Sequence, residues 1–342
     1  MSSNAIRYPS EADTAAVRAG AKAASLLQRQ GALIALIVLV LFGVLRYGPN
    51  FSSAYNVFDA FLNNNSYYAV IALGMTFVII AGGIDLSVGS VAAMAAVAAA
   101  RLSPMGLWPA ILGAVGIGLA TGVLNGALVG RFRMQPFVVT LATLLGARGM
   151  ALVLSNNAPV MVDFQAGFTQ LGMAHVGPVP MPVLICAVLY ALGALVLNFT
   201  RFGRHVYAIG GNEEAARLAG IPIVRTQIAV YALSGAMAGL AGAFLAALSF
   251  SGSPTGALGL ELSAIAAVVV GGTLLTGGVG SVGSTLVGVL LLGLIFNALN
   301  FERGKGLFEL NAYWENLIRG GFLLVVVVFQ SRLAKRLGST MR

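Results

Sequence analysis

Long apolar runs, interrupted by short polar segments, extend over most of the chain. A helix needs about 20 apolar residues to cross the roughly 30 Å hydrocarbon core of a bilayer. The pattern therefore predicts an all-α integral membrane protein with about ten transmembrane helices. We expect these helices at residues 31–46, 66–82, 88–100, 107–130, 136–155, 182–199, 227–248, 261–275, 283–300 and 314–330. The runs 88–100 and 261–275 are short, so we expect broken, tilted or incompletely crossing pieces there.

The composition supports a membrane protein. Hydrophobic residues make up 58% of the 342 residues and charged residues only 9%, whereas soluble domains carry about 25% charged residues. The net charge of +9 would suggest a nucleic-acid partner in a soluble protein. Here the Lys and Arg residues gather at the ends of apolar runs, which indicates topology signals and contacts with membrane lipid. We therefore expect no nucleic-acid partner.

The basic residues also predict how the chain is oriented. We divide it into an N-terminal tail (1–30), a transmembrane domain (31–331) and a basic C-terminal tail (332–342). Basic residues occur in both tails and in the loops 131–133 and 200–226, whereas the loops 47–65 and 156–181 contain no Lys or Arg. Because cytoplasmic loops are enriched in Lys and Arg, we expect both termini and the polar loop 200–226 in the cytoplasm.

The polar loop contains one short helix with clear boundaries. Asn212 is a suitable N-cap, Gly220 can adopt the left-handed conformation that ends a helix, and Pro222 prevents continuation. Glu213 and Glu214 lie at the positive end of the helix dipole. A helix of about two turns is marginal in water, so packing must hold it. The residues leave two interpretations open: a docking element for another protein, or an interfacial helix that caps the loop.

The segment GGIDLSVGS at 82–90 joins two apolar runs with almost no polar spacer. It places Asp85 at or near membrane depth, where a carboxylate is costly and is usually functional or paired. Asp85 can also cap the following run by accepting a hydrogen bond from the N–H of Ser87 or Val88. The segment is either a break in the wall of a solute path, which could move in gating, or a tight capped turn.

A second glycine-rich segment, at 271–281, resembles a phosphate-binding loop at first sight. It lacks the Lys and the following Ser or Thr of the G-x-x-x-x-G-K-[ST] loop, and Gly304-Lys305 is followed by Gly306. We therefore expect no cofactor and no ATP site in this chain. If ATP drives its activity, a separate subunit must supply the ATPase.

Few other residues could carry chemistry. The polar residues within predicted spans that could face a pathway or each other are Asn125, Arg148, Glu261, Asn297 and Asn300. Glu315 and Arg319 stand four residues apart and are expected to pair. The sequence contains no recognisable nucleophile–base set, no Cys/His cluster with metal-ligand spacing and only one cysteine, Cys186. We therefore expect a protein that is not an enzyme.

Five motifs carry a resemblance to a known family. They are GMTFVIIAGGIDLSVGS (74–90), QPFVVTLATLLGARG (135–149), RFGRHVYAIGGNEEAARLAGI (201–221), YALSGAMAGLAG (231–242) and ELSAIAAVVVGGTLLTGGVGSVGST (261–285). In order and spacing, the chain resembles the permease subunits of bacterial ATP-binding-cassette (ABC) importers for sugars, of the ribose/xylose/arabinose type. Within that family it looks closest to galactofuranose importer permeases, through GGTLLTGGVGS and through Asn300, Phe301, Tyr313 and Trp314.

The resemblance implies a type II ABC importer permease of the bacterial inner membrane, moving a monosaccharide that is a pentose or a furanose-form sugar. It implies three kinds of partner: a second permease, identical or closely related; two ATP-binding cassette subunits that carry ATP and Mg²⁺; and a periplasmic sugar-binding protein. The family's ATPase-coupling helix falls on Asn212, Glu213, Glu214, Ala216, Arg217, Leu218 and Gly220. The sugar path is expected near Asp85, Asn125 and Glu261.

Other functions remain open. A secondary sugar transporter or channel without an ATPase partner would need an ion-coupling acid deep in a span, and both Asp85 and Glu261 lie at the ends of predicted segments. A membrane enzyme is disfavoured because no acid–base cluster lies on either face. Within the importer class, galactosides, polyols or a furanose signal molecule are alternative cargoes, because the binding protein of such importers determines most of the specificity.

Overall fold

The computed structural model describes residues 30–302 and, beyond them, residues 314, 317, 320, 321 and 324. The N-terminal tail before residue 30 lies outside the described residues, as do the basic tail 332–342 and the expected pair of Glu315 and Arg319. The predicted span 314–330 has only five described residues, so its extent stays a prediction.

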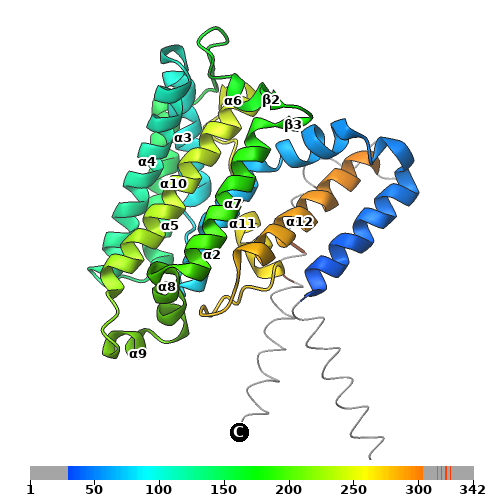
Figure 1. The fold of residues 1–342 in the computed structure, drawn as a ribbon. Coiled ribbons are helices and arrows are strands. Elements are labelled where there is room, and N and C mark those ends of the chain that lie inside the picture. The colour runs from blue at the N-terminus through cyan, green and yellow to red at the C-terminus, as the bar shows by residue number, and fades with distance from the viewer. Residues whose placement is uncertain (1–29, 303–313, 315–316, 318–319, 322–323, 325–342) are drawn as a thin grey trace, which may run out of the picture.

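The described chain is a bundle of helices with two short antiparallel strand pairs (Figure 1). A first helix occupies residues 30–47. The further helices are η1 (Gly48–Asn50), the π-helix η2 (Tyr55–Asn63), α2 (Ser66–Ile80), α3 (Val88–Leu102), η3 (Ser103–Met105), α4 (Leu107–Gly130), α5 (Pro136–Ser155), α6 (Gln170–Met173), α7 (Met181–Phe199), α8 (Arg201–Gly211), α9 (Glu213–Leu218), α10 (Ile223–Ser249), α11 (Leu260–Val270) and α12 (Val282–Glu302). The strands pair as β1 (Val160–Met161) with β4 (Ser251–Gly252), and β2 (His175–Val176) with β3 (Val179–Pro180).

Seven helices in the described part of the chain are long and apolar enough to cross a membrane. They are Gln30–Asn50, Val88–Met105, Leu107–Gly130, Pro136–Ser155, Met181–Phe199, Ile223–Ser249 and Val282–Glu302. α2 and α11 are shorter apolar helices. The prediction of a helical multi-pass membrane protein is confirmed, whereas the count of ten stays a prediction. α11 is short, as expected, but α3 continues through η3 and is longer than predicted.

α10 lies at the centre of the bundle, against α2, α3 and α4. Nearly every residue of α2 is buried. By contrast, α4, α5 and α7 expose large apolar side chains such as Leu112, Leu145 and Val188. Exposed apolar faces of this kind suit contact with lipid. α2, α3 and α10 therefore form the inside of the bundle.

Glycines allow α4 and α10 to approach closely. A Cβ atom added at Gly118 or Gly122 of α4 would collide with the backbone of α10, and one added at Gly235 of α10 would collide with α4. Small residues at such crossings bring membrane helices into backbone contact. These glycines therefore allow the close packing of α4 on α10. Gly116 differs, because an added Cβ atom there would meet nothing within 4 Å.

The segment between α10 and α11 runs through the inside of the bundle without forming a helix. Gly252 lies against Ala96 and Val97 of α3, and the carbonyl group of Ala257 lies against Gly89 in the first turn of α3. α11 therefore begins beside the N-terminus of α3. Irregular backbone is tolerated at membrane depth where protein surrounds it; Gly252, Pro254 and Ala257 fulfil that condition, whereas residues 255, 256 and 258 are exposed.

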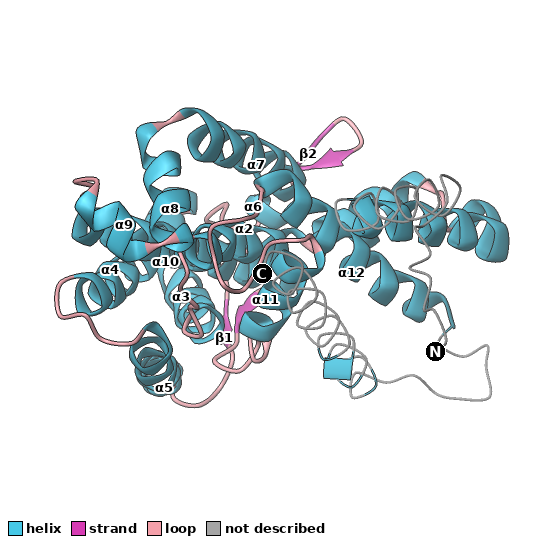
Figure 2. Cartoon of the chain, turned by 90° about the horizontal axis from the view of Figure 1, so that it is seen from below, coloured by secondary structure: helices cyan, strands magenta, loops and turns pink. Residues whose placement is uncertain are grey.

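The first helix and α12 lie together at one edge of the bundle, as a view from the α9 end shows (Figure 2). Phe51, Leu294 and Ala298 form a small apolar cluster between them, separate from the main core. Tyr47 donates a hydrogen bond of 2.8 Å to the carboxylate of Glu302. Most apolar side chains of the first helix are exposed, which suits a helix that faces lipid.

Candidate functional site

The short helix predicted in the polar loop is α9, at the end of the molecule opposite the β2–β3 hairpin (Figure 1). The side-chain oxygen of Asn212 accepts a hydrogen bond of 2.9 Å from the N–H of Ala215. This bond satisfies one of the free donors in the first turn. Gly220 has a φ angle of 76° and follows the end of the helix. The predicted capping of this helix is confirmed.

One face of α9 packs on the protein and the other is open. Ala216 is buried together with Ile209 of α8 and Ile223 of α10. On the open face, Leu218 is 88% exposed. A single exposed leucine is common at protein surfaces; this one lies on a short helix whose opposite face is anchored to the bundle.

Charged side chains surround that leucine. The guanidinium group of Arg217 lies 2.7 Å from a carboxylate oxygen of Glu213 and 3.9 Å from one of Glu214. All three side chains are at least one third exposed, so each pair contributes only about 0.3–0.5 kcal/mol to stability. The pairs fix the charge pattern of the α9 surface more than they stabilise the fold.

α8 precedes α9 and was not predicted, because residues 200–226 were expected to form a polar loop with one short helix. The hydroxyl of Thr200 accepts a hydrogen bond of 3.2 Å from the N–H of Gly203, so Thr200 is the N-cap that could have revealed this helix. Farther along α8, the hydroxyl of Tyr207 donates a hydrogen bond of 2.7 Å to the carbonyl oxygen of Gly280. α8 therefore attaches α9 to the glycine-rich segment 271–281.

The ends of α2 and α8 meet the glycine-rich segment in a tight backbone junction. The N–H of Gly278 donates a hydrogen bond of 2.9 Å to the carbonyl oxygen of Ile80. A Cβ atom added at Gly210 of α8 would collide with the same carbonyl group. The segment that resembles a phosphate-binding loop is thus packed against backbone on both sides. A displacement of α8 would act on the end of α2 and on the segment 271–281 together.

Asp85 lies inside the bundle, in the turn between α2 and α3, and is 1% exposed. Its Oδ1 atom accepts hydrogen bonds from the N–H of Ser87 at 3.0 Å and from the Ser87 hydroxyl at 2.6 Å. Its Oδ2 atom accepts one from the hydroxyl of Ser234 on α10 at 2.9 Å. The predicted cap to Ser87 is confirmed. The carboxylate also ties the turn to the centre of the bundle.

Asn125 of α4 extends this arrangement. Its side-chain amide donates a hydrogen bond of 3.0 Å to the hydroxyl of Ser87, and its Oδ1 atom accepts one of 2.5 Å from Thr143 of α5. Asn125 is fully buried. Asp85 and Asn125, two of the three residues expected near the sugar path, therefore belong to one buried polar chain. We call it the Asp85 chain: Thr143, Asn125, Ser87, Asp85 and Ser234.

Glu261, the third expected path residue, lies at the side of the Asp85 chain. It occupies the first turn of α11, and its carboxylate lies against Gly89, where an added Cβ atom would collide with it. The charge of Arg148 on α5 acts on this carboxylate. Glu261 is only partly buried, so it is the member of the expected set that reaches a surface.

The remaining polar residues of the spans have structural partners or lie at the surface. Asn297 of α12 and Asn56 of η2 exchange hydrogen bonds of 3.2 and 3.1 Å. Asn300 is exposed and Cys186 is buried. Among the residues that the structure describes, no group of three or more His, Cys, Asp or Glu side chains could hold a metal ion.

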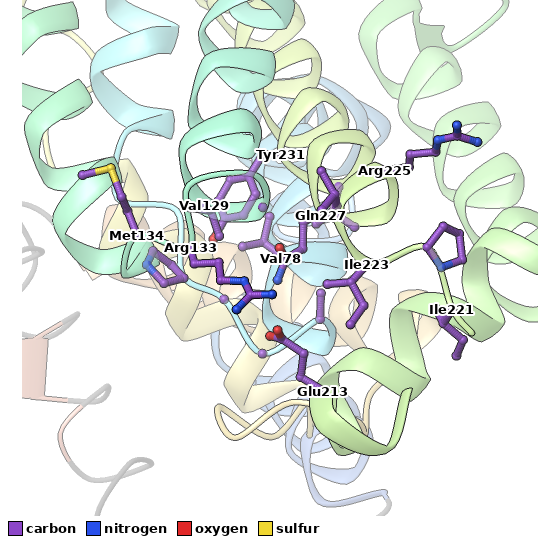
Figure 3. Close-up of a pocket in the computed structure, with 18 of the residues that line it drawn as sticks. Val78, Val129, Arg133, Met134, Glu213, Ile221, Ile223, Arg225, Gln227 and Tyr231 are labelled. Carbon is purple, nitrogen blue, oxygen red and sulfur yellow. The ribbon is translucent and has the colours of Figure 1, made fainter. Parts of the chain in front are cut away.

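A pocket of about 630 Å³ opens between α9 and the bundle. Its walls come from the ends of α2 and α4, the linker 131–135, α9 and the first half of α10. Figure 3 shows Arg133 of the linker and Glu213 of α9 with their charged groups turned toward each other, and Arg225 pointing away. Sequence reasoning missed this pocket because its walls come from segments far apart in the chain.

The described structure is thus an apolar helix bundle with seven helices long enough to cross a membrane and one anchored short helix at an end that contains several arginines. The family described as "Branched-chain amino acid transport system / permease component" matches residues 57–327. The chain belongs to this family of permease components.

Related proteins of known name cover nearly the whole chain. Ribose import permease protein RbsC of Escherichia coli (strain K12) is 38% identical over 311 residues, which are 90% of this chain and 94% of the relative. RbsC of Bacillus subtilis (strain 168) is 36% identical over 309 residues, with coverage of 90% and 94%. L-arabinose ABC transporter permease protein AraH of Azospirillum brasilense is 37% identical over 322 residues, with coverage of 93% and 92%. These matches confirm the resemblance to sugar ABC permeases. No solved structure matches the chain.

Proposed function

We propose that this chain is the membrane-spanning subunit of an ATP-driven sugar importer, and that its cargo is a pentose or a sugar in furanose form. Relatives with 36–38% identity are named for ribose and arabinose import, and both of these sugars are pentoses. The proposed complex contains two ATP-binding cassette subunits, a second permease and a periplasmic sugar-binding protein. A galactofuranose-type cargo falls within the same proposal.

We place the α9 end of the molecule in the cytoplasm of a bacterial cell, with both termini on that side of the inner membrane. The linker 131–135 and the start of α10 line one pocket with α9, so the arginines of these segments gather at one end. At the other end, the loops 47–65 and 156–181 contain no Lys or Arg. This distribution follows the positive-inside rule.

The exposure of Leu218 carries the proposal that α9 is where the ATPase docks. An apolar side chain that is 88% exposed gains free energy when a partner covers it, about 25 cal/mol for each Å² removed from water. The charges of Glu214 and Arg217 lie beside it and can determine the orientation of that partner.

The contacts of α8 provide the route by which α9 would act on the membrane part. A push on α9 moves α8, because Ala216 packs against Ile209 of α8. Tyr207 of α8 then pulls on the carbonyl of Gly280, and Gly210 pushes on the carbonyl of Ile80. The turn that contains Asp85 follows directly after α2. Movement of α9 would therefore shift the start of α3 through the packing of α9 on α8, the Tyr207 hydrogen bond and the backbone junction at Ile80.

We propose that the sugar passes near the beginnings of α3 and α11, where Glu261 lies against Gly89. Glu261 and Arg148 can both form hydrogen bonds to sugar hydroxyl groups. Asp85 and Asn125 would hold the wall of this path in place, because their side chains link the turn at Ser87 to Ser234 of α10 and Thr143 of α5.

The test is Leu218→Ser in the complete complex, reconstituted in vesicles with the ATPase subunits and the binding protein. We expect the substitution to weaken copurification of the ATPase and to lower sugar uptake by about tenfold or more, since a buried leucine at an interface contributes about 1.5–3 kcal/mol. Val176→Ser is the matched control, because Val176 is also exposed (58%) but lies in the hairpin at the other end.

Unchanged copurification and uptake in the Leu218→Ser complex would contradict the docking role of α9. A broader result would contradict the proposed function itself: sugar accumulation against a gradient by this chain alone, in vesicles without ATPase. Such accumulation would identify a secondary transporter.

A further inference from the structure

The pocket beneath α9 has a charge that the fold does not neutralise. Arg133, Arg217 and Arg225 line it, and Glu213 is the acidic residue among the lining side chains. Glu213 already pairs with Arg217 at 2.7 Å. Arg133 has no ion pair within 4 Å among the described residues, although its guanidinium group turns into the pocket (Figure 3). Arg225 also belongs to the lining but points away from the cavity (Figure 3), so the side chains that face it carry an excess of about one positive charge.

The backbone adds to this positive potential. α5 begins at the pocket with Gln135 and Pro136, and α10 begins there with Pro222 and Ile223. These helices have 20 and 27 residues, and the N-terminus of a helix carries about half a positive charge. Two helix N-termini and an unpaired guanidinium group thus converge on one cavity, an arrangement that favours an anionic ligand.

Arg133 itself has an unusual backbone. Its φ angle is 54°, in the left-handed region that costs a non-glycine residue about 1–2 kcal/mol. Backbone strain of this kind persists where the surrounding structure enforces it, often at ligand sites. Here it accompanies the placement of a free guanidinium group at the mouth of the pocket.

At the inner end of the pocket lies an unsatisfied hydroxyl group. Tyr231 is 2% exposed, and its hydroxyl has no hydrogen-bond partner among the described residues. That hydroxyl is close to Gly83, another lining residue. A buried polar group without a partner costs about 1–3 kcal/mol, so a ligand that offers an acceptor or donor here would recover that free energy.

We infer that this pocket binds a small phosphate-bearing molecule. The phosphate lies at Arg133, where a guanidinium group can form two parallel hydrogen bonds to it. The rest of the molecule extends between the apolar walls of Val129 and Val230 and supplies a hydroxyl group to Tyr231. A phosphate monoester carries −1.5 to −2 charges at pH 7, which the one excess positive charge of the facing side chains and the two helix N-termini can offset together.

Two sources offer this chemistry: a soluble sugar phosphate and the headgroup of a phospholipid. Because α9 forms one wall, either occupant would hold α9 in its present position. If the chain is the permease of an ATP-driven sugar importer, a bound sugar phosphate would then reduce the coupling between ATP hydrolysis and sugar transport when sugar is abundant in the cell. Only this regulatory consequence rests on the proposed function; the binding site itself does not.

The experiment measures binding to the purified full-length chain, without ATPase or binding protein. Equilibrium dialysis measures the binding of three soluble probes: D-ribose 5-phosphate, D-ribose and inorganic phosphate. The lipid probe is phosphatidylglycerol in nanodiscs, with phosphatidylcholine for comparison. Native mass spectrometry measures how much of each lipid the protein retains. Arg133→Gln should weaken binding of the phosphate-bearing probe about tenfold or more, since a charge-assisted hydrogen bond contributes about 1.5–3 kcal/mol.

Arg131→Gln is the matched control, because Arg131 lies in the same linker, is exposed and does not line the pocket; binding should stay unchanged. Tyr231→Phe should weaken binding several-fold and keep the ring in place. Arg133-dependent binding of ribose 5-phosphate identifies a soluble ligand, and Arg133-dependent retention of phosphatidylglycerol identifies a lipid. If neither probe shows binding that depends on Arg133, or if Arg131→Gln has the same effect, the inference is overturned. None of these results depends on transport, so a failure here leaves the proposed function intact.

Discussion

Two polar regions lie close together in this molecule and differ in how well they are satisfied. In the Asp85 chain, a buried carboxylate accepts three hydrogen bonds from Ser87 and Ser234. In the pocket beneath α9, the Tyr231 hydroxyl has no partner and Arg133 has no ion pair in the described structure. Both regions use residues of α10 and of the turn after α2.

The difference indicates different roles. Buried polar groups with complete sets of partners hold segments in one arrangement, so the Asp85 chain positions the start of α3. Polar groups left without partners at a cavity raise the free energy of the empty protein and favour whatever fills the cavity. A polar residue at membrane depth thus acquires its role from its partners, and these become visible only in three dimensions.

The largest expected effect on stability comes from Asp85→Ala, which removes the hydrogen-bond acceptor of the Asp85 chain. The change leaves the Ser87 N–H and two hydroxyl groups without an acceptor in a dry interior, which should lower the free energy of unfolding by about 3 kcal/mol or more. Asp85→Asn is the matched control, because its amide oxygen still accepts from Ser87 and its NH₂ group can donate to Ser234. Thermal unfolding in detergent measures both variants. Equal melting temperatures would mean that the Asp85 chain does not hold the bundle.

A smaller effect of opposite sign is expected from Tyr231→Phe in the empty protein. The substitution removes a buried hydroxyl that has no partner and keeps the ring, so the melting temperature should stay the same or rise, by an amount equivalent to about 1 kcal/mol. Ser234→Ala on the same helix serves as comparison and should lower it, because Asp85 then loses a donor. A clear loss of stability in Tyr231→Phe would show that the hydroxyl is already satisfied.

The smallest effect concerns a polar pair at the surface, at the other end of the molecule. Nε2 of His175 lies 2.8 Å from the carboxylate of Asp59, and its Nδ1 atom lies 2.7 Å from the carbonyl oxygen of Met173. The Asp59 hydrogen bond, followed by the Met173 contact, raises the pKa of His175 above its ordinary value near 6.5. The pair therefore stabilises the hairpin fully below pH 6.5, and this contribution is lost as the pH rises through the raised pKa.

Histidine NMR can follow this titration, because the chain contains only two histidines and His205→Gln leaves a single signal. Asp59→Asn should move the midpoint of His175 down toward 6.5, while the bundle melts at the same temperature as before. If the titration midpoint of His175 is the same with and without Asp59→Asn, the Asp59 contact is not the cause of the raised pKa.

Sequence reasoning predicted the features that depend on neighbours in the chain. The cap at Asn212, the end at Gly220 and the bond from Ser87 to Asp85 each join residues only a few positions apart. It could not find Ser234 as a partner of Asp85, because 149 residues separate them and many other serines could have met the carboxylate. α8 was missed because its three glycines and two arginines made residues 201–211 look like part of a loop, although Thr200 offered a cap. The pocket is lined by three stretches that lie far apart in the chain, 78–83, 129–136 and 213–231, so it had no local signature.

The backbone junction where Gly210, Gly278 and the carbonyl of Ile80 meet has a practical consequence for protein engineering. Because no methyl group fits at Gly210, a mutagenesis library should leave this junction unchanged and, on the proposal that the sugar passes near Glu261, vary the surroundings of that residue instead. A larger residue at this junction would force the backbones of α2, α8 and the segment 271–281 apart, and a movement of α8 would then no longer be transmitted to α2.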